Sequence, residues 1–436
     1  MGRCWLWRQT RQRAGLGWVS TRSVEIADWR RTAFSRFDVG FCAKLARASC
    51  NPPKRRNATE AMRFDVGCPC CGGVVSRRNM LRAGLATAAA SVTPKGFAQT
   101  LTPVAGDRSR VAAVDIHAHY FPRAFLELMA TDGSRFGYGA EIADSGGFTL
   151  KSPSRGVVLP SKFIDLELRL ADMDRQGISV QALSLTAPMI YWADGDLSHR
   201  LAVAWNDAAI AAHRAKPDRF VVLATLPMLN EQRAIDELDR VSRLAGVRGI
   251  YLGTNIDNHD LDDPQFAAIF ARIDALGLPV FLHPLQTVGG PRMQDYYLSN
   301  LLGNPIDTAI AACRLIFGGV LDRHPNLQVT LPHAGGVLPI LIGRIDRGWK
   351  VRPEAEHLTR APTSYLRQFH YDTIAHSKAI LQFVISQVGV DRLMIGSDYC
   401  FDMGYERPVE IVDELDLTTE ARAMILGGTA GKLLKI

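Results

Sequence analysis

The feature that most constrains the fold of this chain is a unit that repeats from residue 111 onward. A short run rich in β-branched residues is followed each time by a longer amphipathic stretch, as in parallel βα units. Eight runs can be counted, and they predict a (β/α)8 TIM barrel over residues 107–436. A doubly wound open sheet is the alternative fold, but no GxGxxG turn follows the first run. The runs are VAAVDIHAH (111–119), VQALSLT (180–186), RFVVLATLP (219–227), VRGIYLG (247–253), LPVFLHP (278–284), LQVTLPHAGG (327–336), FHYDTI (369–374) and RLMIGSDY (392–399).

Two long segments interrupt this alternation of strands and helices. The polar, glycine-rich stretch DGSRFGYGAEIADSGGF lies between Phe121 and Phe163, and LQTVGGPRMQDYYLSNLLGNP follows the fifth strand. Long connections at the carboxyl ends of barrel strands commonly recognise substrates. We therefore expect both segments to be insertions that cover the mouth of the barrel.

The charge of the chain is distributed very unevenly. Residues 1–61 carry 13 basic and 4 acidic side chains, and residues 62–106 carry 5 basic and 1 acidic. Because the whole chain has a net charge of +7, residues 107–436 carry a net charge of −6. The basic character thus belongs to the front of the chain, and we expect no nucleic-acid partner for the barrel.

The front of the chain contains a segment typical of an export signal. Arg77 and Arg78 are followed by the weakly apolar run LRAGLATAAASV, by Lys95 and by small residues before a cleavage position after Ala98. This pattern predicts a twin-arginine-like signal over residues 62–98 and a periplasmic protein, with a cytoplasmic protein as the alternative. The run is too short to span a bilayer, so no membrane association beyond export is expected. Residues 1–61 are expected to be a non-native or disordered leader, with translation starting at Met62.

Side chains that can bind a metal recur at the ends of the predicted strands. His117 and His119 are two residues apart on the first strand, so their side chains leave the same face. His283 ends the fifth strand and Asp398 the eighth, which neighbours the first strand in a closed barrel. Three imidazoles and a carboxylate suit Zn²⁺, or another divalent ion such as Mn²⁺. Each residue alone would more often be structural, and their shared place at the active-site face indicates a metal site.

Three further residues lie close to this site in the predicted barrel. His333 ends the sixth strand, where it could act as a general base toward a metal-bound water or as an acid that returns a proton. Asp372 and His376 flank the end of the seventh strand, where contacts to the metal ligands are expected. The remaining histidines lie on predicted helices, in polar loops or at the start of a strand, and we expect them to be structural.

The motifs VDIHAHYFP, FLHP, HAGG and GSDY, in this order, resemble those of the amidohydrolase-related superfamily, and within it the aminocarboxymuconate-semialdehyde decarboxylase-like group. The stretches RFGYG (135–139) and GRIDRGWKVRP (343–353) make the resemblance more specific. It implies that His333 is the acid/base and that zinc is bound by His117, His119, His283 and Asp398. It also implies a homodimer, in which an arginine matching Arg344 reaches the substrate carboxylate of the partner subunit.

Two positions of the expected substrate pocket depart from the family pattern. The family has a tryptophan after the strand-five His-Pro pair, where this chain has Leu285. It also has an arginine ahead of the first helix, for which Arg155 is the nearest counterpart after a small shift. The metal set is complete while the pocket differs, so the sequence indicates the chemistry better than the substrate.

The leading hypothesis is a metal-dependent, non-oxidative decarboxylase of a small unsaturated or aromatic carboxylic acid. The alternative within enzymes is a hydrolase that acts on an ester, lactone or amide with the same barrel. An alternative of another class is a non-catalytic periplasmic protein that binds zinc or a ligand.

Overall fold

The computed structural model describes residues 112–153 and 156–436. The expected leader (1–61), the export signal (62–98) and Arg155 lie outside the described residues. Among the helices of the described part, none is long and apolar enough to cross a membrane.

Eight parallel strands form the central sheet, and each predicted run supplies one of them. The sheet also closes, because the Ile116 amide donates to the Ile395 carbonyl at 2.9 Å and the Asp398 amide donates to the His117 carbonyl at 2.9 Å. The last strand thus neighbours the first, and the predicted barrel is confirmed. The strands are β1 (Val114–His119), β5 (Val180–Ser184), β6 (Phe220–Ala224), β7 (Val247–Gly253), β10 (Val280–His283), β11 (Val329–Leu331), β12 (Phe369–Asp372) and β13 (Leu393–Met394).

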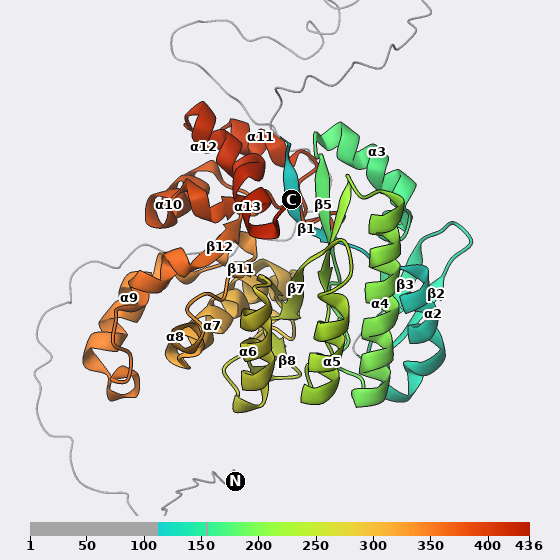
Figure 1. Cartoon of the computed structure of the whole chain (residues 1–436), viewed down its shortest axis with the longest axis horizontal. Helices are drawn as coiled ribbons and strands as arrows, with labels where there is room; N and C mark the ends of the chain where they lie inside the picture. The colour runs from blue at the N-terminus through green and yellow to red at the C-terminus, as the bar shows by residue number, and fades with distance from the viewer. Residues whose placement is uncertain (1–111, 154–155) are drawn as a thin grey trace, which may run out of the picture. The chain divides into compact units, whose positions relative to one another are not determined.

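Helices surround these strands (Figure 1). Several begin where the sequence offers a capping side chain: Asp165 accepts from the amides of Glu167 and Leu168, and Ser377 accepts from the Ile380 amide. The helices are α2 (Arg123–Asp132), α3 (Leu166–Gln176), α4 (Gly195–Ala215), α5 (Glu231–Val241), α6 (Ala267–Leu276), α7 (Asn304–Phe317), α8 (Val320–Arg323), α9 (Leu338–Val351), α10 (Lys378–Val388), α11 (Pro408–Asp413), α12 (Thr419–Ala423) and α13 (Thr429–Leu434).

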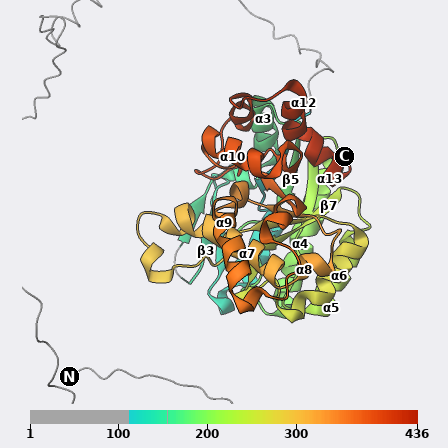
Figure 2. The same ribbon diagram turned by 90° about the vertical axis from the view of Figure 1, so that its left-hand side faces the viewer.

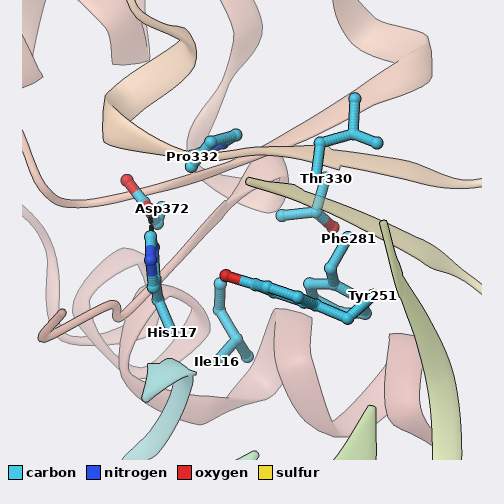
Figure 3. A pocket seen from close by; sticks show the side chains of 8 residues that line it. Ile116, His117, Tyr251, Phe281, Thr330, Pro332 and Asp372 are labelled. Carbon is cyan, nitrogen blue, oxygen red and sulfur yellow. Dashed lines mark hydrogen bonds and ion pairs between the residues drawn. The ribbon is translucent and has the colours of Figure 1, made fainter. Parts of the chain in front are cut away.

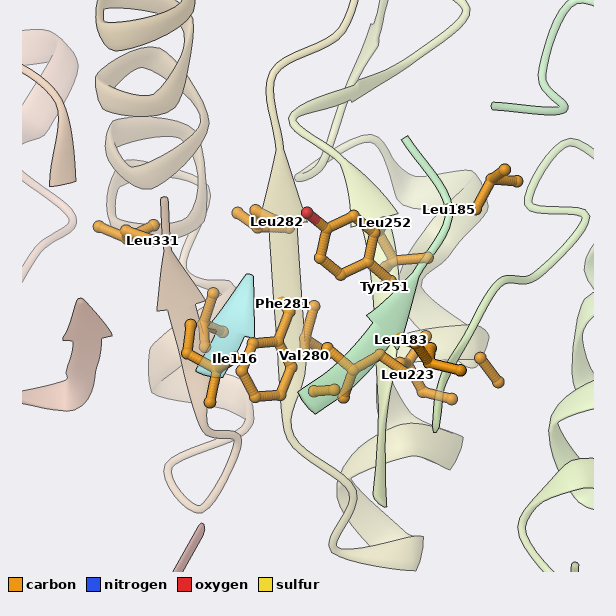
Figure 4. Packing of buried hydrophobic residues seen from close by; sticks show 14 of the residues in the cluster. Ile116, Leu183, Leu185, Leu223, Tyr251, Leu252, Val280, Phe281, Leu282 and Leu331 are labelled. Carbon is orange, nitrogen blue, oxygen red and sulfur yellow. The ribbon is translucent and has the colours of Figure 1, made fainter. Parts of the chain in front are cut away.

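Apolar side chains of the strands fill the core of the barrel. Leu183, Leu223 and Phe281 come from three different strands, and each is at most 1% exposed. Figure 4 shows these side chains packed together with Ile116 and Tyr251. A packed interior of this kind holds the strand ends rigidly, which is what a set of metal ligands at those ends requires.

Both expected insertions are present. The first contains an antiparallel sheet of β2 (Gly139–Ile142), β3 (Phe148–Lys151) and β4 (Gly156–Leu159). It ends at Phe163, whose ring lies 4.9 Å from that of Phe401. The ring of Phe401 in turn lies 5.4 Å from His119, so this insertion reaches the predicted site. The second contains a 3₁₀ turn (Gly290–Met293) and a π-helical turn (Ser299–Gly303) that leads into α7.

Candidate metal centre

The structure brings three predicted metal ligands together at the carboxyl ends of the strands. His117 and His119 leave β1 on the same face, and their Nε2 atoms lie 3.1 Å apart. His283 ends β10, and one nitrogen from each of the three rings lies within 4.8 Å of the other two. All three side chains are buried, with 2%, 0% and 6% exposure.

Asp398 completes the set from the segment after β13. Its Oδ1 lies 3.0 Å from Nε2 of His119 and 3.7 Å from Nε2 of His117. The backbone of Asp398 has a φ of 56°, a left-handed conformation that few residues other than glycine adopt. Asp398 thus adds a carboxylate beside His117 and His119, and three imidazoles with a carboxylate fit Zn²⁺ or another borderline divalent ion.

The outer nitrogen of each imidazole is engaged, which fixes the tautomer of the ring. Nδ1 of His117 lies 2.8 Å from Oδ2 of Asp372, and Nδ1 of His283 lies 2.8 Å from the Pro284 carbonyl oxygen. Nδ1 of His119 lies 3.2 Å from the Ser184 hydroxyl, which donates to the Ala118 carbonyl. The Nε2 atoms face the other ligands: that of His119 lies 3.0 Å from Oδ1 of Asp398, and that of His283 lies 3.2 Å from the Thr186 hydroxyl. A tautomer with its proton on Nδ1 leaves Nε2 as the nitrogen that would bind a metal.

The pKa values of the ligands do not all shift the same way. Burial would lower the pKa of His117, but the hydrogen bond with Asp372 and the charges of Asp398 and Asp372 outweigh it and raise that pKa. Burial lowers the pKa of His119 to about 4 and holds that of His283 well below its ordinary value. Burial alone would raise the pKa of Asp398, but the hydrogen bond with His119 and the nearby charge of His117 outweigh it and lower that pKa. Because a metal ion binds deprotonated ligands, the shifts of His119, His283 and Asp398 favour its binding, whereas at His117 it would compete with a proton.

His333 lies beside these ligands, with its ring centroid 5.5 Å from that of His117. His333 and Ala334 both have a φ of 54°, and Asp372 holds this turn by accepting from their amides at 3.0 and 2.8 Å. Burial lowers the pKa of His333. Its Nδ1 is buried and has no hydrogen-bond partner among the described residues.

Asp372 connects this turn with the metal ligands. It is fully buried and accepts from His117 and from the two amides of the His333 turn. Gly396 makes the arrangement sterically feasible, because a Cβ there would lie 2.8 Å from Cβ of Asp372 and 3.2 Å from that of His117. One carboxylate therefore orients a ligand and the proposed acid/base together.

The other predicted site residues lie apart from this cluster. His376 is exposed, its ring packs on Tyr405 at 4.7 Å, and no hydrogen bond joins it to a ligand. Arg344 is exposed on α9, and the described part of the chain pairs it with no acidic side chain. Leu285, which follows the His-Pro pair, is 8% exposed, and its amide donates to the Thr254 hydroxyl at 3.2 Å.

Several residues around the ligands were not identified from the sequence. Ser184 ends β5, and Thr186 lies two residues after it. A single sequence rarely shows whether such small hydroxyl side chains support a site or are only structural. Asp115 is different, because it lies two residues before His117 and therefore on the same face of β1. That spacing was a usable signal.

A small cavity lies next to His117, on the core side of the ligands. It has a volume of about 10 Å³ and is lined by Ile116, His117, Tyr251, Phe281, Leu282, Thr330, Pro332 and Asp372. Figure 3 shows Tyr251 across this space from the His117–Asp372 pair. It holds at most about one water molecule, so a substrate must approach the ligands from elsewhere.

A closed barrel with three imidazoles and a carboxylate at its strand ends defines the class of metal-dependent barrel enzymes. The chain belongs to the amidohydrolase family, since the family described as Amidohydrolase matches residues 114–436.

Known proteins narrow this assignment. The chain is 32% identical over 337 residues to 2-amino-3-carboxymuconate-6-semialdehyde decarboxylase of Dictyostelium discoideum. The aligned region covers 74% of this chain and 92% of that protein. The crystal structure of 5-carboxyvanillate decarboxylase from Sphingomonas paucimobilis matches with a TM-score of 0.64 and 26% identity, over 75% of this chain and 100% of that one. A 5-carboxyvanillate decarboxylase from Novosphingobium aromaticivorans, solved with manganese and 4-hydroxy-3-methoxy-5-nitrobenzoic acid, has the same fold, with a TM-score of 0.65 and 22% identity over 76% of this chain and 98% of that one. The predicted resemblance to the decarboxylase group is confirmed.

Proposed function

We propose that this chain is a metal-dependent, non-oxidative carboxy-lyase that removes CO₂ from a small aromatic or unsaturated carboxylic acid. One observation carries the proposal: Asp372 joins a metal ligand, His117, to the turn that presents His333, in a family whose members named above are decarboxylases. The same carboxylate thus organises both parts that the reaction needs.

His117, His119, His283 and Asp398 would hold the metal ion. We propose Zn²⁺, with Mn²⁺ as the alternative, because imidazole and carboxylate ligands accept both and a relative of the same fold was solved with manganese. When bound, the ion would act as a Lewis acid that orients substrate oxygens and stabilises the negative charge that develops as CO₂ leaves.

His333 is the proposed acid/base. Loss of CO₂ breaks a carbon–carbon bond, the electron pair stays on the substrate carbon, and that carbon must then gain a proton. His333 lies beside the ligands, and its Nδ1 has no partner among the described residues. The imidazole of His333 would deliver this proton to the carbon and take up another before the next turnover.

Arg344 is proposed to bind the substrate carboxylate of a partner subunit in a homodimer. It lines a groove of about 660 Å³ between α7 and α9, whose walls are mostly apolar side chains such as Ile310, Phe317 and Ile345. Ile340 on the same helix is 56% exposed, and α7 and α9 lie together in Figure 2. An apolar surface with an unpaired arginine supports a contact with a second copy of the chain. Arg155 remains a second candidate for binding the substrate.

The first experiment measures metal and CO₂ together. The purified protein is analysed for bound metal and screened for CO₂ release from hydroxybenzoic, carboxyvanillic and muconic-type acids, before and after removal of metal by a chelator. We expect CO₂ release that disappears with the metal and returns when it is added back. Full activity without metal would refute the mechanism. Ester or lactone hydrolysis without CO₂ release would favour the hydrolase, and bound metal without turnover of either kind would favour a binding protein.

The role of Arg344 is tested with Arg344→Ala and a matched control, Arg347→Ala, one turn further along the same exposed helix. Loss of a charge-assisted carboxylate contact is expected to lower kcat/KM on the order of 100-fold in Arg344→Ala only. Light scattering of both variants shows whether the dimer persists. Unchanged kcat/KM in a dimeric Arg344→Ala would exclude the proposed contact.

We also propose export through the twin-arginine-like segment. The support is the Arg77–Arg78 pair ahead of a weakly apolar run, with the small residues Gly96 and Ala98 before a cleavage position after Ala98. Conversion of both arginines to lysine should leave the protein in the cytoplasm of a bacterial host. Equal periplasmic yields with and without the change would contradict export by this route.

A further inference from the structure

Asp115 is a buried carboxylate on β1 that the proposed reaction does not use. It is 0% exposed and accepts four hydrogen bonds. Oδ1 accepts from the amides of His117 at 3.1 Å and Ser397 at 3.0 Å. Oδ2 accepts from Nε2 of Gln181 at 2.9 Å and from the Ser397 hydroxyl at 2.6 Å. Both oxygens of this carboxylate are thus fully engaged.

These bonds connect two segments that carry metal ligands. His117 belongs to β1, whereas Ser397 immediately precedes Asp398 in the segment after β13. Ser397 also accepts from the Tyr399 amide through its hydroxyl at 3.1 Å, on the other side of Asp398. Asp115 and Ser397 therefore fix the backbone on both sides of Asp398, which has the left-handed φ of 56°.

The buried guanidinium of Arg169 is linked to this carboxylate through the side chain of Gln181. Nη1 of Arg169 donates to Oε1 of Gln181 at 3.0 Å, and Gln181 donates to Asp115. Nη2 of Arg169 donates to the backbone carbonyl of His119. Arg169 is 0% exposed, and among the described residues no carboxylate forms an ion pair with it. Gln181 thus links a buried cation to a buried anion, and the linked groups hold both ligand-bearing backbones.

A metal site binds tightly when its ligands already stand where the ion needs them, because no free energy is then spent on arranging them. Asp398 and the two histidines come from segments that are far apart in the sequence. Their relative position depends on the contacts between these segments. The hydrogen bonds between Asp115 and Ser397 are such contacts.

We propose that Asp115 and Ser397 are positioning residues for the metal centre, which set the place of Asp398 relative to His117 and His119 without touching the metal or the substrate. This inference rests on the metal centre of the proposed function.

The test compares Asp115→Asn with Glu237→Gln. Glu237 is also a buried carboxylate, 1% exposed, but it bonds Asn206 and Arg240 in the helical layer. At position 115, asparagine can keep one acceptor oxygen for the two amides, while its NH₂ group would face the NH₂ group of Gln181. The metal is removed from each protein, and the affinity for Mn²⁺ is measured by titration.

We expect Asp115→Asn to bind Mn²⁺ about 10- to 100-fold more weakly, the usual effect of removing a partner that orients metal ligands. Glu237→Gln should bind within about twofold of the unchanged protein, even if its melting temperature falls. The Co²⁺-substituted protein gives a second readout, because its visible absorption bands report the ligand geometry. We expect these bands to shift in Asp115→Asn and to stay unchanged in Glu237→Gln.

If Asp115→Asn does not fold, Ser397→Ala tests the same proposal. It removes only the hydroxyl, so a smaller weakening on the order of tenfold is expected, together with a shift of the Co²⁺ bands. A folded variant of either kind that keeps the affinity and the spectrum of the unchanged protein would overturn the positioning role. If the unchanged protein binds neither ion, the proposed function itself is refuted, and the two failures are thereby distinguished.

Discussion

Asp372 offers the sharpest test of the site, because a single atom exchange removes an acceptor and leaves the shape intact. In the structure Oδ1 accepts from the amides of Ala334 and Ile374 at 2.8 and 3.0 Å. Oδ2 accepts from Nδ1 of His117 at 2.8 Å and from the His333 amide at 3.0 Å. The carboxamide of Asp372→Asn has only one oxygen, so whichever way it turns, two of these four donors face an NH₂ group.

The size of the effect follows from these contacts. If the NH₂ group faces the amides of Ala334 and Ile374, two buried donors lose their acceptor, which costs about 2–6 kcal/mol of stability at about 1–3 kcal/mol each. If it faces His117 and the His333 amide, one amide loses its acceptor, and the NH₂ group favours the His117 tautomer that carries its proton on Nε2. A metal must then displace that proton, so we expect binding about 10- to 100-fold weaker, or about 1.4–2.8 kcal/mol.

The assay is a titration of metal-free protein with Zn²⁺ or Mn²⁺ in competition with a chelator, accompanied by urea unfolding. Glu237→Gln serves as the control, since it removes a buried carboxylate far from the ligands in the helical layer. Asp372→Asn with unchanged affinity for both ions would refute the argument that this carboxylate fixes the His117 tautomer.

Three further predictions follow from the same structure. His333→Asn should lower kcat about 10²- to 10⁴-fold at unchanged metal content, and loss of the metal would instead assign His333 to the ligand set. Burial raises the pKa of Asp307 from 3.8 to about 6, so its contribution to stability is lost as the pH rises from about 4 through 6. Relative to the unchanged protein, Asp307→Asn should thus gain up to about 3 kcal/mol in unfolding free energy between pH 4 and pH 7, and a difference independent of pH would contradict this. Gly396→Ala should lower the melting temperature and the metal affinity together, because the added Cβ would lie too close to Asp372. A variant as stable as the unchanged protein would contradict this, because it would show that Asp372 can move away from the added methyl group.

Much of the barrel and of its metal site was predictable from the sequence. The alternation of short strands with amphipathic stretches determines parallel βα units, and each predicted run contains a strand of the observed barrel. The spacing of His117 and His119 placed both rings on one face of β1, since side chains of a strand alternate between faces. The ends of the strands then identified His283, His333 and Asp398 as neighbours, because a closed barrel brings the carboxyl ends of all its strands to one rim.

Only the tertiary structure decided which residues support these ligands. Asp372 and His376 had equal standing in the sequence, yet one accepts from His117 and the other lies exposed against Tyr405. Likewise Gln181 and Arg169 read as ordinary polar residues, and their link through Asp115 to Ser397 exists because the first and last strands meet. Periodicity is a local property that a sequence displays directly, whereas a hydrogen bond between residues 282 positions apart depends on closure of the whole barrel.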